Sequence, residues 1–276
     1  MKTKQKIIAI TSASLLAVAC AQAQTTITAW TFENDGPAGF NPNPAASTGS
    51  GTAAALGMNN SYGTPGSSTN ISDILPNDAV DSDPSSAFTW RVRGGPNTAT
   101  AANGWSSLAP IGTQGAEFDA STVGYNNIQV SFDLETTKQA EANLELEYTT
   151  DGINWINTVL SYSGTGATTK NNTTSANTVT GTYIQFTAGQ FYDGITANLS
   201  GIAGVNNDPT FGIRIVNAST GVDDVNGSGT AYNNNSGNWR FDNVVIASVP
   251  EPSTLALVGC GFAALIGFRR FGNRQV

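Results

Sequence analysis

Alternation of apolar and polar residues is the clearest pattern in this chain. From Ile128 to Glu135 every even position is apolar and every odd position is polar, which predicts a strand with one buried and one solvated face. Leu144–Tyr148 and Phe88–Arg93 alternate in the same way. Asp151-Gly152 precedes a further apolar run, Trp155–Leu160, and both turn residues tolerate positive φ, so the sequence predicts a hairpin there.

Further strands are expected where short apolar or aromatic runs are bounded by Gly, Asn, Ser or Thr. They are Thr26–Phe32, Ala116–Phe118, Tyr183–Thr187, Phe211–Val216 and Trp239–Ile246. Long polar segments separate them, and the first, residues 39–70, is interpreted as a surface loop, with internal disorder as the alternative. One helical turn is expected within 195–205. Many strands without an amphipathic helix predict an all-β fold, a single jelly-roll-like β-sandwich over residues 24–248.

The apolar side of each alternating strand predicts the core. The expected buried residues are Trp90, Phe132, Leu134, Leu146, Ile213 and Phe241.

The first 23 residues have the features of a secretory signal peptide. Three lysines precede an apolar stretch, and Ala21-Gln22-Ala23 provides an A-x-A site for signal peptidase after export through the Sec translocon. Cys20 leaves a lipoprotein interpretation open, although Ala17 stands where a larger aliphatic residue is usual.

The C-terminal segment, residues 249–276, has three parts. Val249-Pro250-Glu251-Pro252 is extended and stiff because each proline fixes φ and lacks a donor. An uncharged run from Thr254 to Phe268 follows, long enough for roughly 22 Å of helix. Arg269-Arg270 ends it and should stay on the cytoplasmic side of a membrane. Physical reasoning alone predicts a short transmembrane anchor.

This order of parts resembles the PEP-CTERM sorting signal, also catalogued as the ice-binding protein C-terminal domain. The resemblance covers Val249 to about Arg270. It implies recognition by exosortase, a membrane-embedded cysteine transpeptidase that removes the tail during export. It implies a route to the cell envelope and carries no ice-binding function to this chain.

Composition limits the chemistry of the body. The chain has no histidine, and both cysteines lie in the end segments, so Ser-His and Cys-His nucleophiles, disulfides and His-based zinc sites are excluded from the mature body. The body carries 6 Lys and Arg against 19 Asp and Glu, a net charge of −13. Such a surface repels nucleic acid.

Two kinds of side chain are candidates for function. Glu117, Glu135, Glu145 and Glu147 could supply a glycosidase pair, although alternation favours a solvated strand face. The segment 149–155 partly resembles the Asp-box turn of sialidase-type propellers, but it occurs once and a plain hairpin is favoured. Aromatic residues in predicted loops are candidates for stacking on sugars, chiefly Trp105 and Tyr125, with packing onto the core as the alternative. The others are Tyr162, Tyr192 and Tyr232.

A calcium site is the third candidate. The segments W-T-F-E, T-T-D-G-I-N-W and W-R-F-D-N-V resemble secreted jelly-roll modules, including carbohydrate-binding ones. Pairing of the first and last strands, common in jelly rolls, would bring Glu33 near Asp242, and Ca²⁺ would relieve their repulsion. Related-looking modules carry structural calcium in a similar place. The alternative is that either carboxylate pairs with Arg240 or caps a turn.

The sequence therefore predicts an exported bacterial envelope protein, first a membrane-anchored precursor and then a cell-envelope or matrix component. The expected role of the body is non-enzymatic binding or structuring of extracellular polysaccharide. A carboxylate-based glycan hydrolase and a ligand-free matrix protein are the alternatives.

The tail predicts a processed C-terminus. Intact mass spectrometry of the envelope form should give a chain that lacks the residues after the Pro250–Pro252 region, because exosortase removes the tail. A mature chain ending at Val276 would contradict the prediction.

Overall fold

The body, Thr26–Ser248, forms one compact unit. The computed structural model describes residues 24–33, 39–40, 43–58, 73–76, 88–93, 105–106, 109–164, 167–168, 179–187, 191–218, 233–234 and 237–249. The predicted signal peptide, its site at Ala21 and Ala23, and the tail from Pro250 onward lie outside the described residues.

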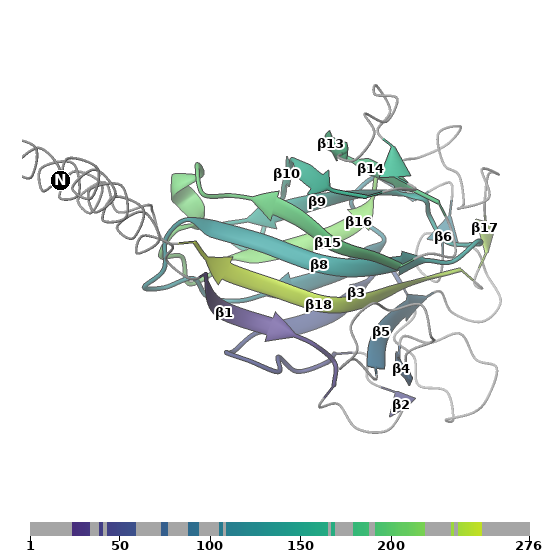
Figure 1. Ribbon diagram of the computed structural model, residues 1–276, viewed down its shortest axis with the longest axis horizontal. Helices are drawn as coiled ribbons and strands as arrows, with labels where there is room; N and C mark the ends of the chain where they lie inside the picture. Colours follow the sequence, from purple (N-terminus) through teal and green to yellow (C-terminus); the bar gives the residue numbers. More distant parts are fainter. Residues whose placement is uncertain are drawn as a thin grey trace, which may run out of the picture. The chain divides into compact units, whose positions relative to one another are not determined.

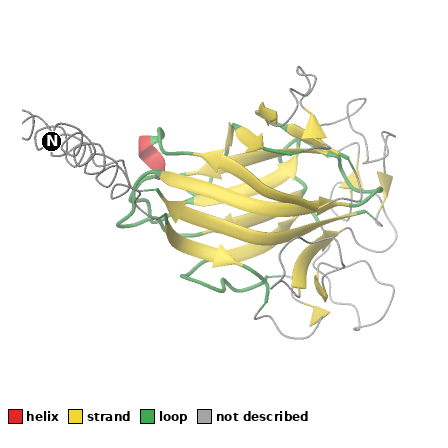
Figure 2. Ribbon diagram, viewed as in Figure 1, coloured by secondary structure: helices red, strands yellow, loops and turns green. Residues whose placement is uncertain are grey.

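Two antiparallel sheets face each other in the body (Figure 1), so the prediction of an all-β sandwich is confirmed. The helical structure in the described residues is one 3₁₀ turn, η1 (Ala203–Val205), which lies within the predicted span (Figure 2).

The first sheet has the order β13-β11-β15-β8-β18-β5-β4-β2, and β1 also pairs with β18. Its strands are β1 (Thr25–Trp30), β2 (Gly39–Phe40), β4 (Asp73–Pro76), β5 (Phe88–Arg93), β8 (Ile128–Thr136), β11 (Leu160–Tyr162), β13 (Val179–Gly181), β15 (Phe191–Asn198) and β18 (Asn238–Ser248). The first and last long strands therefore pair, as expected for a jelly roll.

The second sheet has the order β12-β14-β9-β16-β7-β3, with β10 on the edge of β9. Its strands are β3 (Thr52–Leu56), β7 (Gly115–Asp119), β9 (Asn143–Thr149), β10 (Ile156–Thr158), β12 (Ala167–Thr168), β14 (Ile184–Phe186) and β16 (Gly212–Asn217). A separate ribbon pairs β6 (Trp105–Ser106) with β17 (Asn233–Asn234).

Three corrections to the predicted strands concern how the sheets are built. The run Trp155–Leu160 is not one strand: β10 belongs to the second sheet and β11 to the first, so the chain crosses between sheets at Val159. The segment 39–70 contains β3, which pairs along β7. Residues 191–198 form β15, whose alternation is interrupted by a bulge where Gly194 has φ of +73°.

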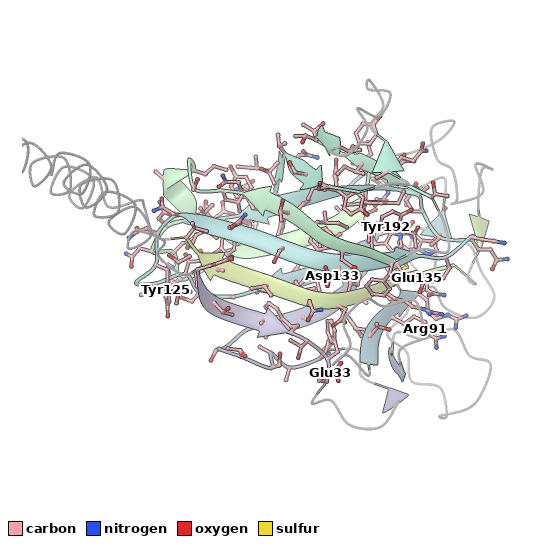
Figure 3. All side chains as sticks on the ribbon, viewed as in Figure 1. Glu33, Arg91, Tyr125, Asp133, Glu135 and Tyr192 are labelled. Carbon is pink, nitrogen blue, oxygen red and sulfur yellow. The ribbon has the colours of Figure 1, made fainter. Side chains whose placement is uncertain are left out.

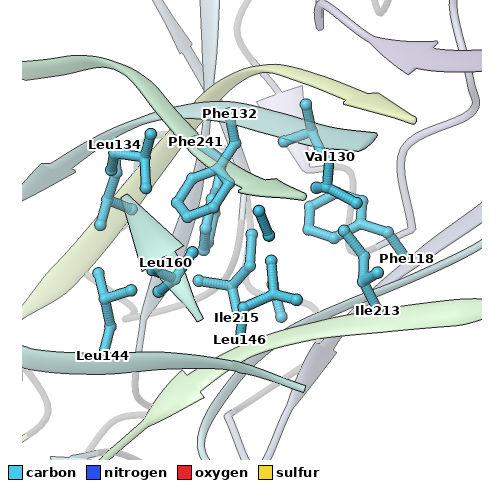
Figure 4. Close-up of a cluster of buried hydrophobic side chains, with 14 of the residues drawn as sticks. Phe118, Val130, Phe132, Leu134, Leu144, Leu146, Leu160, Ile213, Ile215 and Phe241 are labelled. Carbon is cyan, nitrogen blue, oxygen red and sulfur yellow. The ribbon is translucent and has the colours of Figure 1, made fainter. Parts of the chain in front are cut away.

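The core lies between the sheets, and every residue predicted to be buried is fully buried. Phe132 and Phe241 from the first sheet face Leu146 and Ile213 from the second (Figure 4). Phe118 packs edge-on against Trp30, Trp90 and Phe241, with ring centroids 5.1–5.8 Å apart. Because side chains alternate along a strand, these inward contacts also determine which side chains of each sheet point outward.

Replacement of Phe132 with alanine should lower the free energy of unfolding by ~3–5 kcal/mol, because a buried ring is removed and the space cannot fully collapse. Denaturant unfolding followed by tryptophan fluorescence measures the change. Ser131→Ala, one position away on the outer side, is the control and should change stability by less than about 0.5 kcal/mol. Equal effects of the two substitutions would refute the register of β8.

Candidate functional site

Trp105 does not lie in an exposed loop. It lies in β6 with no exposed surface, and its Nε1 donates to the carbonyl of Gly237 at 2.9 Å. Its ring packs against Trp239 with centroids 4.6 Å apart. The proposal that Trp105 stacks on a sugar is therefore wrong, because the ring has no accessible face.

The tyrosines are also largely part of the core. Tyr162 and Tyr192 lie in β11 and β15 and are buried, in contrast to the loop positions predicted for them. Burial raises the pKa of Tyr192 to about 12. Tyr125 does lie in a loop, at one end of the body (Figure 3). It is half-buried and packs against the core. Tyr232 lies outside the described residues.

The two proposed calcium ligands differ in exposure. Asp242 has no exposed surface, and one of its carboxylate oxygens accepts a 2.7 Å hydrogen bond from the Asn243 amide. Glu33 follows β1 and is half-buried. Arg240, the alternative partner, forms an ion pair with Glu135 at 2.9 Å. Among the described residues, no group of three or more His, Cys, Asp and Glu residues could hold a metal ion. The site therefore stays a prediction that requires backbone carbonyls as further ligands.

Four carboxylates gather on the outer side of the second sheet. Cross-strand pairing places Glu117 and Glu147 on either side of Arg214, and Asp119 beside Gly212. Glu145 lies two residues before Glu147 on the same side of β9. This surface, called the carboxylate face below, consists of Glu117, Asp119, Glu145, Glu147, Arg214 and Trp155.

Arg214 organises the carboxylate face. Its Nε donates to Glu117 Oε2 at 2.6 Å. Its guanidinium carbon lies 3.7 Å from the centroid of the Trp155 ring, in cation–π contact. The neighbouring Gly212 provides room, because a Cβ there would lie 2.3 Å from Asp119 Oδ1 and 3.2 Å from Trp155 Cη2. A larger residue at 212 would displace the Asp119 carboxylate and crowd the indole.

The hairpin turn holds Trp155 in this position. The Asp151 carboxylate accepts from the backbone amides of Ile153 at 2.8 Å and Asn154 at 2.7 Å, and from Asn154 Nδ2 at 2.6 Å. These hydrogen bonds, chiefly those from Asn154, hold the pKa of Asp151 well below its usual range. The turn is the predicted hairpin, and it fixes the start of β10 against β9.

The carboxylate face is partly desolvated. Burial, and then the charge of Glu147, raises the pKa of Glu145 to about 7. Burial and the nearby Glu117 raise the pKa of Asp119 to about 6. Burial also raises the pKa of Glu147, whereas Arg214 lowers it. Glu145 is only 7% exposed and accepts a hydrogen bond from Asn157 Nδ2. The expectation of a solvated strand face is therefore wrong at Glu145.

Sequence reasoning identified three members of the carboxylate face and missed the other three. Glu117, Glu145 and Glu147 were candidates, whereas Glu135 lies on the first sheet. Asp119 follows Glu117 at a spacing of two, which is a signal for the same side of a strand. Nothing local relates Trp155 to Arg214, because their contact depends on the pairing of distant strands.

The comparison with protein families identifies the tail. Residues 248–270 match the PEP-CTERM protein-sorting motif. The motif implies an exported, membrane-anchored precursor with exosortase as its processing partner. The matched residues begin at Ser248, the last residue of β18, so the sorting motif follows the folded body without a spacer.

No curated protein and no solved structure matches the chain at a significant level. In the part of the chain that the structure describes, no helix is long and apolar enough to cross a membrane.

The calcium prediction is tested by thermal unfolding. If Glu33 and Asp242 bind Ca²⁺ only in the folded state, adding calcium to EDTA-treated protein should raise Tm with increasing free Ca²⁺. Asp242→Asn should abolish the increase. An unchanged Tm of the wild-type protein would remove the site.

The raised pKa values in the carboxylate face predict that the free energy of unfolding decreases as the pH rises. A carboxyl whose pKa is raised by folding stabilises the folded state below its unfolded pKa, and this contribution is lost as the pH passes the folded pKa. For Glu145 the window runs from 4.5 to about 7.

Glu145→Gln should flatten the dependence of Tm on pH across that window, because the amide cannot ionise. The control is Gln129→Ala, on the outer side of the first sheet, which removes no ionisable group and should keep the wild-type slope. Parallel curves for wild-type and Glu145→Gln proteins would contradict the prediction.

Proposed function

We propose that the body binds neutral extracellular polysaccharide on the carboxylate face without catalysing a reaction. The observation that carries the proposal is the exposure of Trp155. The chain has five tryptophans, and four of them, Trp30, Trp90, Trp105 and Trp239, have no exposed surface. Trp155 is half-buried, on the outside of a sheet and against an arginine.

The chemistry of the face suits sugar hydroxyls. An indole provides an apolar surface for the C–H side of a pyranose ring. Carboxylates accept hydrogen bonds from sugar hydroxyl groups, and a guanidinium donates hydrogen bonds to the hydroxyl oxygens. The net charge of −13 on the body disfavours polyanionic glycans and nucleic acid. A neutral polysaccharide meets none of this repulsion.

A glycan hydrolase is the second candidate, and one observation favours it. Glu145 and Glu147 lie on the same side of one strand, and the pKa of Glu145 is about 7. A carboxyl that stays protonated near neutral pH can act as a general acid beside an ionised partner. A matrix protein without a ligand is the third candidate, and it requires neither the tryptophan nor the raised pKa.

Binding is tested by titrating the purified envelope form with a panel of neutral and acidic polysaccharides. Neutral chains should bind, and Trp155→Ala should weaken binding by about tenfold, which corresponds to ~1.4 kcal/mol. Ile156→Ala is the matched control, because Ile156 is the next residue and lies on the opposite side of β10.

The alternatives predict different results. Release of reducing ends that Glu145→Gln or Glu147→Gln abolishes would establish a hydrolase. Absence of binding to every polysaccharide would favour the matrix protein. If Trp155→Ala and Ile156→Ala lowered the affinity for polysaccharide equally, binding would have to occur elsewhere on the body.

A further inference from the structure

One end of the sandwich is almost free of charge. Here β18 ends and β8 begins, since Ser248 pairs with Ile128. The loops at 120–127 and 199–211 connect the two sheets at this end, and the hairpin turn at 150–155 lies beside them. The two loops are called the exit cap below, because the chain leaves the body here towards the sorting motif.

The exit cap contains one charged residue, Asp208, and that residue is only 7% exposed. The adjoining turn adds Asp151, and Asp119 at the end of β7 directly precedes the loop at 120–127. Charges gather instead near the opposite end of the body, where β8 ends and β18 begins. They include Arg93, Glu135, Lys138, Glu141 and Arg240. Figure 3 shows Tyr125 at one end of the body and Glu135 and Arg91 towards the other.

Uncharged hydrogen bonds connect the two loops of the exit cap. Asn207 Oδ1 accepts from the Gly124 amide at 2.8 Å, and Asn206 Oδ1 accepts from the Asn127 amide at 2.9 Å. The Thr122 hydroxyl donates to the Val205 carbonyl at 2.6 Å. Ser248 Oγ donates to the Asn126 carbonyl at 2.6 Å, which ties the end of β18 to the cap.

Apolar side chains project from this end. Val123 in the exit cap is 53% exposed, and Ile153 in the adjoining turn is 78% exposed. Val249, directly after β18, is 36% exposed. Tyr125, a residue type that favours membrane interfaces, is half-buried in the same loop as Val123. An end that is apolar at its tips and otherwise neutral differs from the acidic remainder of the body.

The tether keeps this end close to the membrane. Residues 249–253 separate β18 from the uncharged run that begins at Thr254, and five residues span at most about 17 Å. That maximum is about twice the Debye length of about 8–10 Å, so any conformation short of full extension brings the end of the body towards the range in which charges interact. An acidic surface held at such a distance would be repelled by anionic headgroups, whereas a neutral end would not.

We propose that in the membrane-anchored precursor the exit cap lies against the lipid surface, with Val123 and Ile153 in the headgroup region. The contact orients the body so that its acidic surfaces face away from the bilayer. It also holds the start of the sorting motif at the membrane, where a membrane-embedded transpeptidase acts. The proposal does not depend on sugar binding, because it uses no residue of the carboxylate face.

The test uses the full-length precursor reconstituted in vesicles of phosphatidylethanolamine and phosphatidylglycerol. After Cys20→Ser and Cys260→Ser, an environment-sensitive fluorophore is attached at Val123→Cys or at Lys138→Cys. Lipids with a nitroxide on the headgroup should quench the label at position 123 strongly and the label at position 138 weakly. Equal quenching at the two positions would overturn the proposal.

A second variant distinguishes contact between the exit cap and lipid from closeness that the tether alone would impose. Ile153→Asp should reduce quenching at position 123, because a charge opposes burial in the interface. Ile111→Asp, at a residue that is 51% exposed and precedes β7 at the opposite end, should leave quenching unchanged. If neither substitution changes quenching, the tether alone explains the proximity and the contact is refuted.

Exosortase is the competing partner. If the label at position 123 reports burial only after exosortase is added to the vesicles, the enzyme and not the lipid covers the exit cap. That outcome also contradicts the proposal.

Discussion

Pairing of β18 with its neighbours is the interaction on which the body depends. This last strand contacts β8 along one edge and both β5 and β1 along the other. Trp239, Phe241, Val244 and Ile246 project from it into the core. Asn243, with φ of +47°, forms a bulge that moves the inward positions from odd to even numbers and keeps both halves of the strand buried. The first sheet is incomplete without β18.

This dependence links folding to sorting. Ser248 pairs with Ile128 and is also the first residue of the matched motif. Cleavage before Ser248 would remove part of a central strand, so an intact body requires that the cut fall after it. The first sheet closes only after β18 has paired with β8, β5 and β1.

β8 lies between two bulges, one in β15 at Gly194 and one in β18 at Asn243. Gly194 on β15 donates its amide to Asp133 Oδ1 at 2.6 Å, and Asn243 on β18 donates its side-chain amide to Asp133 Oδ2 at 3.0 Å. One carboxylate thus holds the irregular segments of both neighbouring strands. The outer side of the first sheet is used for this support, whereas the outer side of the second sheet carries Trp155 and Arg214.

Local pattern was sufficient to predict the core and the long strands other than β15. Alternation in Ile128–Glu135 is uninterrupted, and Phe132 and Leu134 are buried as period two requires. The same rule failed for β15, because the bulge at Asp193-Gly194 breaks the period. It could not predict the exchange of sheets at Val159, since each half of that run contains two apolar residues and one polar residue. Strands of two or three residues, such as β12, carry too few positions for any pattern.

The candidate site was harder to predict than the fold. Trp105 lies among Asn, Gly and Ser in the sequence, which suggests an exposed loop, yet contact with Trp239 buries it. The contact of Trp155 with Arg214 joins residues from two strands that are far apart in the chain. Their proximity follows from register, which single-sequence reasoning does not provide.

The central claim, that the carboxylate face is the ligand surface, is tested most directly by the indole N–H signals of the five tryptophans in ¹H–¹⁵N NMR spectra. During titration with a neutral polysaccharide that binds, the Trp155 signal should shift while those of the four buried tryptophans stay in place. A bound polysaccharide that leaves the Trp155 signal unchanged would contradict the account.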